Sequence, residues 1–218
     1  MIIKRGKMKI IPSILKIMGV AALLLAGMSA QAATQKGPDL MDKKPEGYPT
    51  ATFAGGCFWC TESEYRHQPG ILFTRSGYTG GTLENPKYED THDGKSGHAE
   101  AVEITFDPAK TSYRKLVEYF MTEAHDPTQL NRQGPDTGTQ YRSAIFYHDD
   151  EQKKIAEDVI AELTAAKKYS KPILTEVTQA GKFWEAEEYH QQYYEKYEAK
   201  TGQPHINDWL KRQRRDAK

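Results

Sequence analysis

The sequence predicts an α+β fold, in which helices pack on a mixed β-sheet. Segments with strand character and segments with helical spacing are interspersed without a repeat, and the steady alternation of a doubly wound sheet is missing. Two long glycine-rich loops, 77–97 and 125–139, interrupt the pattern. Loops of that length are unusual in a compact domain unless they carry function, so we expect the functional site there.

The first half of the predicted domain supplies a strand, a helix and two more strands. The expected elements are a strand over 50–54, a turn at 55–56, a helix from Cys57 to about Pro69, and strands over 71–78 and 99–106. Cys57 would then lie at a helix N-terminus. Backbone N–H groups and the positive end of the helix dipole favour a thiolate there, so we expect a reactive sulfur.

The second half is richer in helix. The expected elements are a helix over 111–124, a strand over 140–148, an amphipathic helix over 149–168, a strand over 173–177, and an acidic, tyrosine-rich helix over 184–200. The acidic part of the last helix, 185–198, could contact partners, but a solvated helix face is the preferred interpretation.

The N-terminus has the pattern of a secretory signal peptide. Five basic residues precede an apolar stretch over 17–28, which is followed by Ala30-Gln31-Ala32. The stretch is too short for a spanning helix, so we expect cleavage after Ala32, a periplasmic location and no stable membrane association. A retained signal anchor is the alternative.

Cleavage at this point leaves a chain of ordinary size for one domain. We expect a signal peptide over 1–32, a flexible segment over 33–47 and one catalytic domain over 48–218 in a monomer. The balance of basic and acidic residues moves from 30 against 30 to 25 against 30, a net charge of −5. This mildly acidic balance argues against nucleic acid as a partner.

Cys57 and Cys60 are the only cysteines, which limits their role. A disulfide between them would close too small a ring to staple a fold. A zinc site would need two more ligands, and no histidine spacing supplies them, so we expect neither a metal nor another cofactor. Redox chemistry at the cysteine pair is the remaining interpretation.

The sequence resembles the A-type methionine sulfoxide reductases, also called peptide-methionine (S)-S-oxide reductases. The resemblance covers most of the chain after the signal peptide. It rests on seven motifs in order: Gly-Gly-Cys-Phe-Trp at 55–59, Gly77-Tyr78-Thr79-Gly80-Gly81, Asn85-Pro86 to Tyr88, Gly97-His98-Ala99-Glu100, His125-Asp126-Pro127-Thr128, Gly134-Pro135-Asp136 to Tyr141-Arg142-Ser143, and Glu188-Tyr189-His190-Gln191.

The resemblance implies an α/β two-layer sandwich with a rolled mixed sheet, a ferredoxin-like core and long active-site loops. It also implies reduction of methionine-S-sulfoxide, free or in proteins, as repair after oxidative damage. Cys57 would be the nucleophile, and Glu100 the acid that protonates the sulfoxide oxygen, which requires burial to raise its pKa. Tyr88 and Tyr141 would donate hydrogen bonds to that oxygen, although packing is the simpler role for a tyrosine.

The remaining roles also follow from the resemblance. Phe58 and Trp59 would hold the substrate methyl group, although both are ordinary core residues by type. Asp136 would help to organise the site, although an Asp in its Gly-Pro-Asp-Thr-Gly context is also a good turn former. His98 and His190 are left outside the predicted catalytic set.

Cys60 departs from a common pattern of the family, in which Gly stands here and the resolving cysteines lie near the C-terminus. We expect the Cys57 sulfenic acid to condense with Cys60, and a thioredoxin-like reductant to reopen the disulfide. The main alternative is a periplasmic thiol-disulfide oxidoreductase, but the Pro-bearing loop that a thioredoxin unit needs is not evident. A non-catalytic peptide-binding module, in which both thiols would be dispensable, is a third hypothesis.

Overall fold

A computed structural model describes residues 39–205 and 207 of the chain. The signal peptide predicted over 1–32 lies outside the described residues, as does the first part of the segment predicted over 33–47. Within the part of the chain that is described, none of the helices combines the length and apolar character that a membrane span requires.

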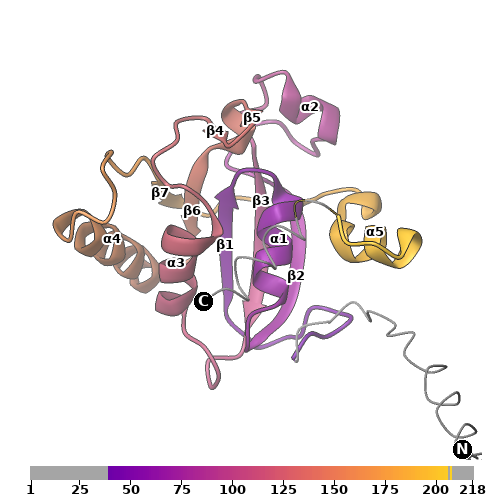
Figure 1. Ribbon diagram of the computed structural model, residues 1–218, viewed down its shortest axis with the longest axis horizontal. Helices are drawn as coiled ribbons and strands as arrows, with labels where there is room; N and C mark the ends of the chain where they lie inside the picture. Colours follow the sequence, from indigo (N-terminus) through magenta and orange to yellow (C-terminus); the bar gives the residue numbers. More distant parts are fainter. Residues whose placement is uncertain (1–38, 206, 208–218) are drawn as a thin grey trace, which may run out of the picture. The chain divides into compact units, whose positions relative to one another are not determined.

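A six-stranded sheet with the order β7-β6-β1-β3-β2-β8 forms the centre of the fold (Figure 1). Its strands are β1 Thr50–Gly55, β2 Ile71–Thr79, β3 Ala99–Phe106, β6 Ser143–Tyr147, β7 Glu176–Gln179 and β8 Trp184–Glu185. β7 runs parallel to β6, whereas the other pairs are antiparallel, so the sheet is mixed. The sequence of β1, α1, β2, β3, α3 and β6, with strand order β6-β1-β3-β2, is a ferredoxin-like core. The predicted α+β fold class is therefore confirmed.

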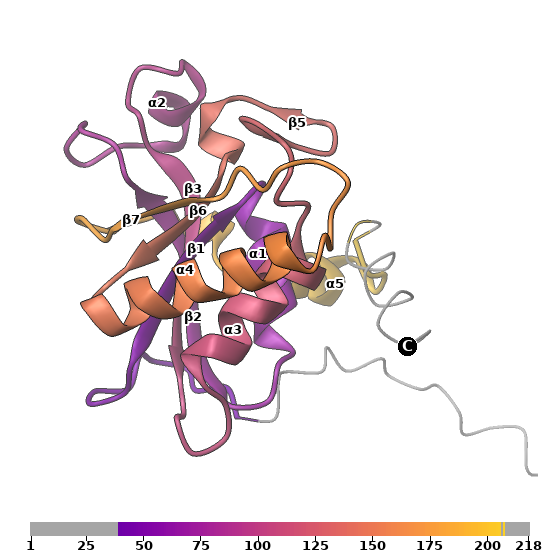
Figure 2. The ribbon, with the colours of Figure 1, turned by 90° about the vertical axis from the view of Figure 1, so that its left-hand side faces the viewer.

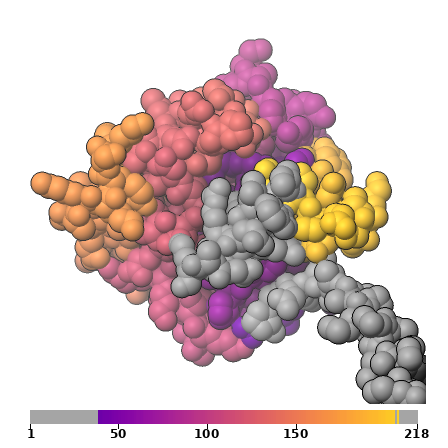
Figure 3. Space-filling view, in the orientation of Figure 1, coloured from indigo at the N-terminus to yellow at the C-terminus, as the bar shows by residue number. Residues whose placement is uncertain are grey.

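The helices are α1 Phe58–Arg66, α2 Tyr88–His92, α3 Tyr113–Tyr119, α4 Asp150–Ala165 and α5 Tyr193–Thr201. Helices α1 and α3 cover one face of the sheet, and α4 packs beside α3 (Figure 2). Helix α5 contacts α1. In Figure 3, α4 and α5 lie on opposite sides of the view. A π-helical turn, Phe120–Ala124, continues α3.

Side chains alternate along each strand, and the main core and one residue of the candidate site lie on the same face of the sheet. Phe53 on β1 is fully buried, and its ring stacks on Phe120 at 4.9 Å between centroids. Val102 and Ile104 on β3 belong to the same buried cluster. Because side chains two residues apart on a strand share a face, Glu100 lies in this row, at the end nearest α1.

The prediction of a helix over 184–200 is wrong for the first part of this range. Trp184–Glu185 form β8, which pairs with Gly77 and Tyr78 at the end of β2. An unpaired strand edge needs partners for its N–H and C=O groups, and this requirement outweighs the helical spacing of the side chains. Helix α5 begins only at Tyr193, because Gln192 has a left-handed backbone with φ 47°.

Other boundaries differ by a few residues, and both long loops contain short elements. The strand predicted over 173–177 is β7, Glu176–Gln179, in register with β6. The loop over 77–97 contains α2, and the loop over 125–139 contains β4, Arg132–Gln133, paired with β5, Asp136–Thr137.

Candidate active site

Cys57 lies between β1 and α1, as predicted, and is the N-cap residue of the helix. Gly56 makes the turn possible, because its φ of +93° is unfavourable for other residues and a Cβ there would lie 2.5 Å from the Cβ of Gln133. The carbonyl of Cys57 accepts hydrogen bonds from the backbone N–H groups of Cys60 and Thr61, at 3.1 and 3.2 Å. The two thiols therefore lie on the first turn of one helix.

The electrostatic surroundings of Cys57 differ from the expectation. A hydrogen bond to the Cys60 side chain, burial, and the nearby charges of Cys60 and Glu100 raise the pKa of Cys57 well above its ordinary value. These effects exceed the opposing influence of the Cys60 backbone N–H. The effect expected from the helix N-terminus is thus opposed by the neighbouring thiol and by burial, and the net shift of the Cys57 pKa is upward.

Glu100, on β3, is a buried carboxyl next to the start of α1. Its side chain is 1 % exposed, and its Oε2 accepts a hydrogen bond of 3.1 Å from the backbone N–H of Phe58. Burial raises the pKa of Glu100 to about 8, and the charges of Asp136 and Cys60 act in the same direction. The carboxyl therefore holds a proton near neutral pH and can deliver it inside the site.

Two tyrosine hydroxyls lie beside this carboxyl. Tyr88 begins α2, and Tyr141 ends a short 3₁₀ turn before β6; their side chains are hydrogen-bonded to each other. Tyr141 Oη also lies 3.1 Å from His92 Nε2, which is 3.8 Å from Glu100 Oε1. Burial, followed by the charge of Glu100, raises the pKa of both tyrosines, so both remain protonated donors.

Aromatic rings form one wall of the site. Phe58 is 1 % exposed, and its ring lies 6.4 Å from Trp59 and 4.9 Å from His190. Trp59 donates a hydrogen bond of 3.0 Å from Nε1 to His190 Nδ1 and stacks on Tyr193 at 3.7 Å between centroids. The indole is thus fixed both by the 3₁₀ turn Glu188–His190 and by α5, which leaves a rigid apolar surface next to Cys57.

The structure brings the predicted site residues together, although they come from four separate parts of the chain. Asp136 lies on β5, and its charge acts on Glu100 and on Tyr141. His98 does not join this group. It supports the loop after β2, with Nδ1 accepting from the Gly81 N–H at 3.1 Å and Nε2 donating to the Leu83 carbonyl at 2.7 Å.

Three further residues contact the site but were not predicted from the sequence. Glu187 accepts hydrogen bonds from the Tyr78 hydroxyl at 3.0 Å and from the Tyr88 backbone N–H at 3.2 Å. His92 contacts Tyr141, and its position four residues after Tyr88 is a helical spacing that could have revealed it. Tyr194 contacts Cys60, and nothing in its local sequence distinguishes it from the tyrosines around it.

The chemistry of this arrangement is that of thiols and a proton donor. Among the described residues, no group of three or more His, Cys, Asp or Glu side chains is placed to hold a metal ion. Two adjacent thiols can supply two electrons, and a protonated carboxyl can supply a proton to the atom that is reduced. The fold and the site together define a thiol-dependent oxidoreductase.

Comparison with known proteins identifies the family. The family model described as peptide methionine sulfoxide reductase matches residues 49–218, and the chain belongs to this family. The family predicted from the sequence motifs is therefore confirmed. The chain is an oxidoreductase with peptide-methionine (S)-S-oxide reductase activity, and the reduction it performs repairs oxidised methionine.

Relatives cover most of the chain. Peptide methionine sulfoxide reductase MsrA of Geobacter metallireducens is 51% identical over 156 residues, which are 72% of this chain and 95% of the relative. The reduced form of Mxr1 from Saccharomyces cerevisiae superposes with a TM-score of 0.66 at 32% identity, covering 75% of this chain and 92% of Mxr1. Mxr1 in complex with Trx2 gives a TM-score of 0.50 at 26% identity, over 71% and 91% of the two chains.

Proposed function

We propose that the chain reduces methionine-S-sulfoxide, free and in proteins, through a sulfenic acid on Cys57 and a disulfide between Cys57 and Cys60. One observation carries this proposal: the Cys57 thiol is hydrogen-bonded to the Cys60 side chain, and the charge of Glu100 also acts on it. A nucleophile, a resolving thiol and a proton donor are thereby combined on one turn of helix and one strand.

The first step is reduction of the sulfoxide. The sulfoxide sulfur becomes electrophilic when its oxygen gains a proton, and Glu100, with a pKa of about 8, is protonated at neutral pH. The hydroxyls of Tyr88 and Tyr141 donate hydrogen bonds to the same oxygen as charge develops on it. Cys57 sulfur attacks, the oxygen passes to it, and methionine leaves. Because the resting Cys57 is a thiol, it loses a proton in this step, and that proton replaces the one that Glu100 gives to the sulfoxide oxygen.

The aromatic wall accounts for substrate recognition. The methyl group of the sulfoxide packs against Phe58 and Trp59, and Asp136 orients the polar side of the site. A rigid indole, fixed by His190 and Tyr193, holds a small apolar group with little loss of conformational freedom.

The second step regenerates the enzyme. Cys60 attacks the sulfenic sulfur of Cys57, a disulfide forms, and water leaves. A thioredoxin-like dithiol then reopens the disulfide by exchange. The existence of a complex between the yeast relative and Trx2 supports a reductant of this kind.

The experiment that tests this mechanism compares the separated S and R epimers of methionine sulfoxide. Wild type, Cys57→Ser and Cys60→Ser are assayed with dithiothreitol and with thioredoxin. Methionine is expected from the S epimer only. Cys57→Ser is expected to be inactive, and Cys60→Ser to complete one turnover but to fail with thioredoxin. Sustained turnover of Cys60→Ser with thioredoxin would exclude Cys60 as the resolving thiol. Disulfide exchange without sulfoxide reduction would indicate the oxidoreductase alternative.

We also propose that the enzyme acts in the periplasm after cleavage of residues 1–32. The support is the basic, apolar and small-residue pattern of this segment. Mass spectrometry of the protein from a periplasmic fraction is expected to give a chain that begins at Ala33. An uncleaved chain in the membrane fraction would indicate a retained signal anchor.

A further inference from the structure

Helix α5 brings one hydroxyl group to the cysteine pair. Tyr194, in the first turn of α5, is 2 % exposed, and its Oη lies 3.0 Å from Cys60 Sγ. The contact joins residues 134 positions apart in the sequence. The Trp59 ring, next to Cys60 in the sequence, stacks on Tyr193. The thiol that must attack Cys57 is therefore in direct contact with a tyrosine hydroxyl.

The position of Tyr194 is fixed relative to the helix that carries Cys60. Glu62 lies on α1, two residues after Cys60. Its Oε2 accepts a hydrogen bond of 2.9 Å from the backbone N–H of Gln192, two residues before Tyr194. Arg66, also on α1, donates from Nε to Glu195 Oε1 of α5 at 2.6 Å. Two polar contacts thus hold α5 against α1 on either side of Tyr194.

The hydroxyl of Tyr194 also has a second hydrogen-bond partner. The side chain of Asn207 donates a hydrogen bond to the Tyr194 oxygen, while the Tyr194 ring stacks on His205 at 4.7 Å between centroids. The hydroxyl hydrogen is then available for donation to the Cys60 sulfur, 3.0 Å away. Burial, followed by the charge of Cys60, raises the pKa of Tyr194, so the phenol does not take up the role of a base.

We propose that Tyr194 is a catalytic residue of the resolving step, in which its O–H donates a hydrogen bond to Cys60 sulfur and stabilises the thiolate that attacks Cys57. The inference rests on the proposed function of Cys60. In the step, the S–O bond of the Cys57 sulfenic acid breaks and the S–S bond forms. The S–S bond takes its electron pair from Cys60 sulfur, and the S–O pair leaves with the hydroxyl, which takes up the proton of the Cys60 thiol and departs as water. Cys60 sulfur is oxidised and the sulfenic sulfur of Cys57 is reduced, so no further oxidant is required.

The test separates the two half-reactions. Wild type, Tyr194→Phe, Tyr197→Phe and Cys60→Ser react with a stoichiometric amount of the S epimer and no reductant. Methionine formation is followed by chromatography, and the sulfenic acid is trapped with dimedone and measured by mass spectrometry. Tyr197 is a matched control because it lies on the same helix, also contacts His205, and is 36 % exposed.

We expect all four proteins to release methionine at similar rates. In Tyr194→Phe the disulfide should form about 10- to 100-fold more slowly, as expected for loss of one hydrogen bond to a developing charge. Tyr197→Phe should match wild type, and Cys60→Ser should keep the sulfenic acid. If Tyr194→Phe forms the disulfide at the wild-type rate while Cys60→Ser does not form it, the inference about Tyr194 is wrong and the proposed function stands. If Cys60→Ser turns over normally with thioredoxin, the proposed function itself fails.

A second readout distinguishes stabilisation of the thiolate from a merely structural role. In a Cys57→Ser background, Cys60 is the remaining thiol, and its alkylation by iodoacetamide can be followed against pH. The Tyr194→Phe change should move the midpoint upward by about one pH unit, because it removes a donor to the thiolate. Glu100, whose charge also acts on Cys60, is common to both proteins and does not alter the difference. An unchanged midpoint would overturn the inference, and Asn207→Ala, at an exposed position, should give a smaller shift in the same direction.

Discussion

Two buried carboxyls, one on helix α1 and one on strand β3 next to its start, have different surroundings. Glu62 and Glu100 are each 1 % exposed, and burial raises the pKa of both. Glu62 accepts hydrogen bonds from Thr74 Oγ1 at 2.9 Å, from Ser76 Oγ at 3.1 Å and from the Gln192 N–H at 2.9 Å. The positive charge of Arg66 also opposes the effect of burial on Glu62.

Glu100 has far fewer groups that stabilise its anion. The Phe58 N–H is the hydrogen bond that lowers its pKa, and the nearby Asp136 and Cys60 raise it. The same side chain at the same burial is thus surrounded by hydrogen-bond donors and a cation in one place and by acidic groups in the other. The hydrogen-bond donors around a buried carboxyl, and not its burial alone, therefore decide its role.

The largest expected effect is on catalysis, from Glu100→Gln. The amide cannot deliver a proton to the sulfoxide oxygen, so kcat/KM for the S epimer should fall by about 10²- to 10⁴-fold. Steady-state kinetics with dithiothreitol measure this change, and methionine release in a single turnover should slow by the same factor.

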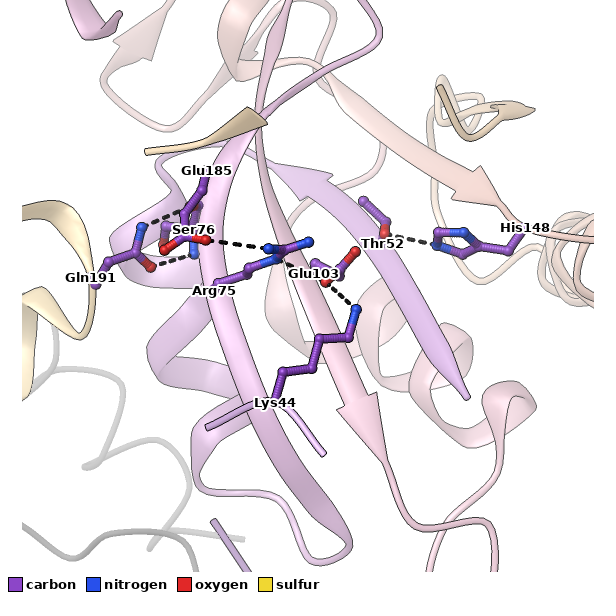
Figure 4. Close-up of polar contacts among 8 residues, drawn as sticks. All are labelled: Lys44, Thr52, Arg75, Ser76, Glu103, His148, Glu185 and Gln191. Atoms are coloured by element: carbon purple, nitrogen blue, oxygen red, sulfur yellow. Dashed lines mark hydrogen bonds and ion pairs between the residues drawn. The ribbon is translucent and has the colours of Figure 1, made fainter. Parts of the chain in front are cut away.

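Glu103→Gln is the matched control for that change. Glu103 lies three residues further along β3 and therefore on the opposite face of the sheet, where it pairs with Lys44 at 2.7 Å and Arg75 at 2.8 Å (Figure 4). Its loss should leave the rate for the S epimer within about twofold of wild type. Equal losses of rate in both variants would mean that Glu100 acts through the sheet and not as the acid.

The pH dependence of stability should reveal the raised pKa of Glu100. A carboxyl whose pKa rises from 4.5 to about 8 on folding stabilises the fold fully below about pH 4.5, and this contribution is lost as the pH rises through about 8. In Glu100→Gln this loss is absent. The free energy of unfolding of the variant minus that of wild type should therefore increase by roughly 3–5 kcal/mol between about pH 5 and pH 9.

Urea denaturation of both proteins under reducing conditions measures this difference. The other ionisable side chains of the site are present in both proteins, so their contributions largely cancel. A difference that does not change with pH would mean that Glu100 is ionised at neutral pH and cannot be the acid.

Glu62→Gln should have the opposite signature, a loss of stability with little effect on sulfoxide reduction. The amide presents one acceptor oxygen and an N–H₂ group to three donors, so at least one donor loses its partner. The free energy of unfolding should fall by about 2 kcal/mol in urea denaturation. Methionine release from the S epimer in a single turnover should stay close to wild type. A large loss of that rate without a loss of stability would contradict a structural role.

The sequence was sufficient for the core of the fold, for reasons that particular elements make clear. Strand β3 begins and ends where predicted, because Ala99–Phe106 is an apolar and β-branched run bounded by turn residues. Strand β8 was missed because its two residues pair only through the edge of β2, a contact distant in sequence. Local spacing contains no information about such an edge.

The site shows the same division. The motif around Cys57 and the Gly-His-Ala-Glu ending at Glu100 could be recognised by residue type and order. The reversed direction of the Cys57 pKa could not, because it depends on burial and on the hydrogen bond to Cys60. Glu187 and Tyr194 were also beyond the sequence, since each acts through contacts with residues about 100 or more positions away.

The smallest expected effect tests whether the partners of Glu62 act on its charge. Ser76 is fully buried and donates from Oγ to Glu62 Oε2 at 3.1 Å. Ser76→Ala removes this donor but keeps the two backbone contacts of Ser76 with the Gln191 side chain (Figure 4). The free energy of unfolding should fall by about 1 kcal/mol in wild type and by less in a Glu62→Gln background, because a hydrogen bond to a charged acceptor is the stronger one. Urea denaturation of the four proteins of this double-mutant cycle measures the coupling. An equal loss in both backgrounds would show that the serine hydroxyl stabilises the fold by some contact other than the Glu62 carboxylate, and the contrast with Glu100 would then rest on Thr74, Gln192 and Arg66 alone.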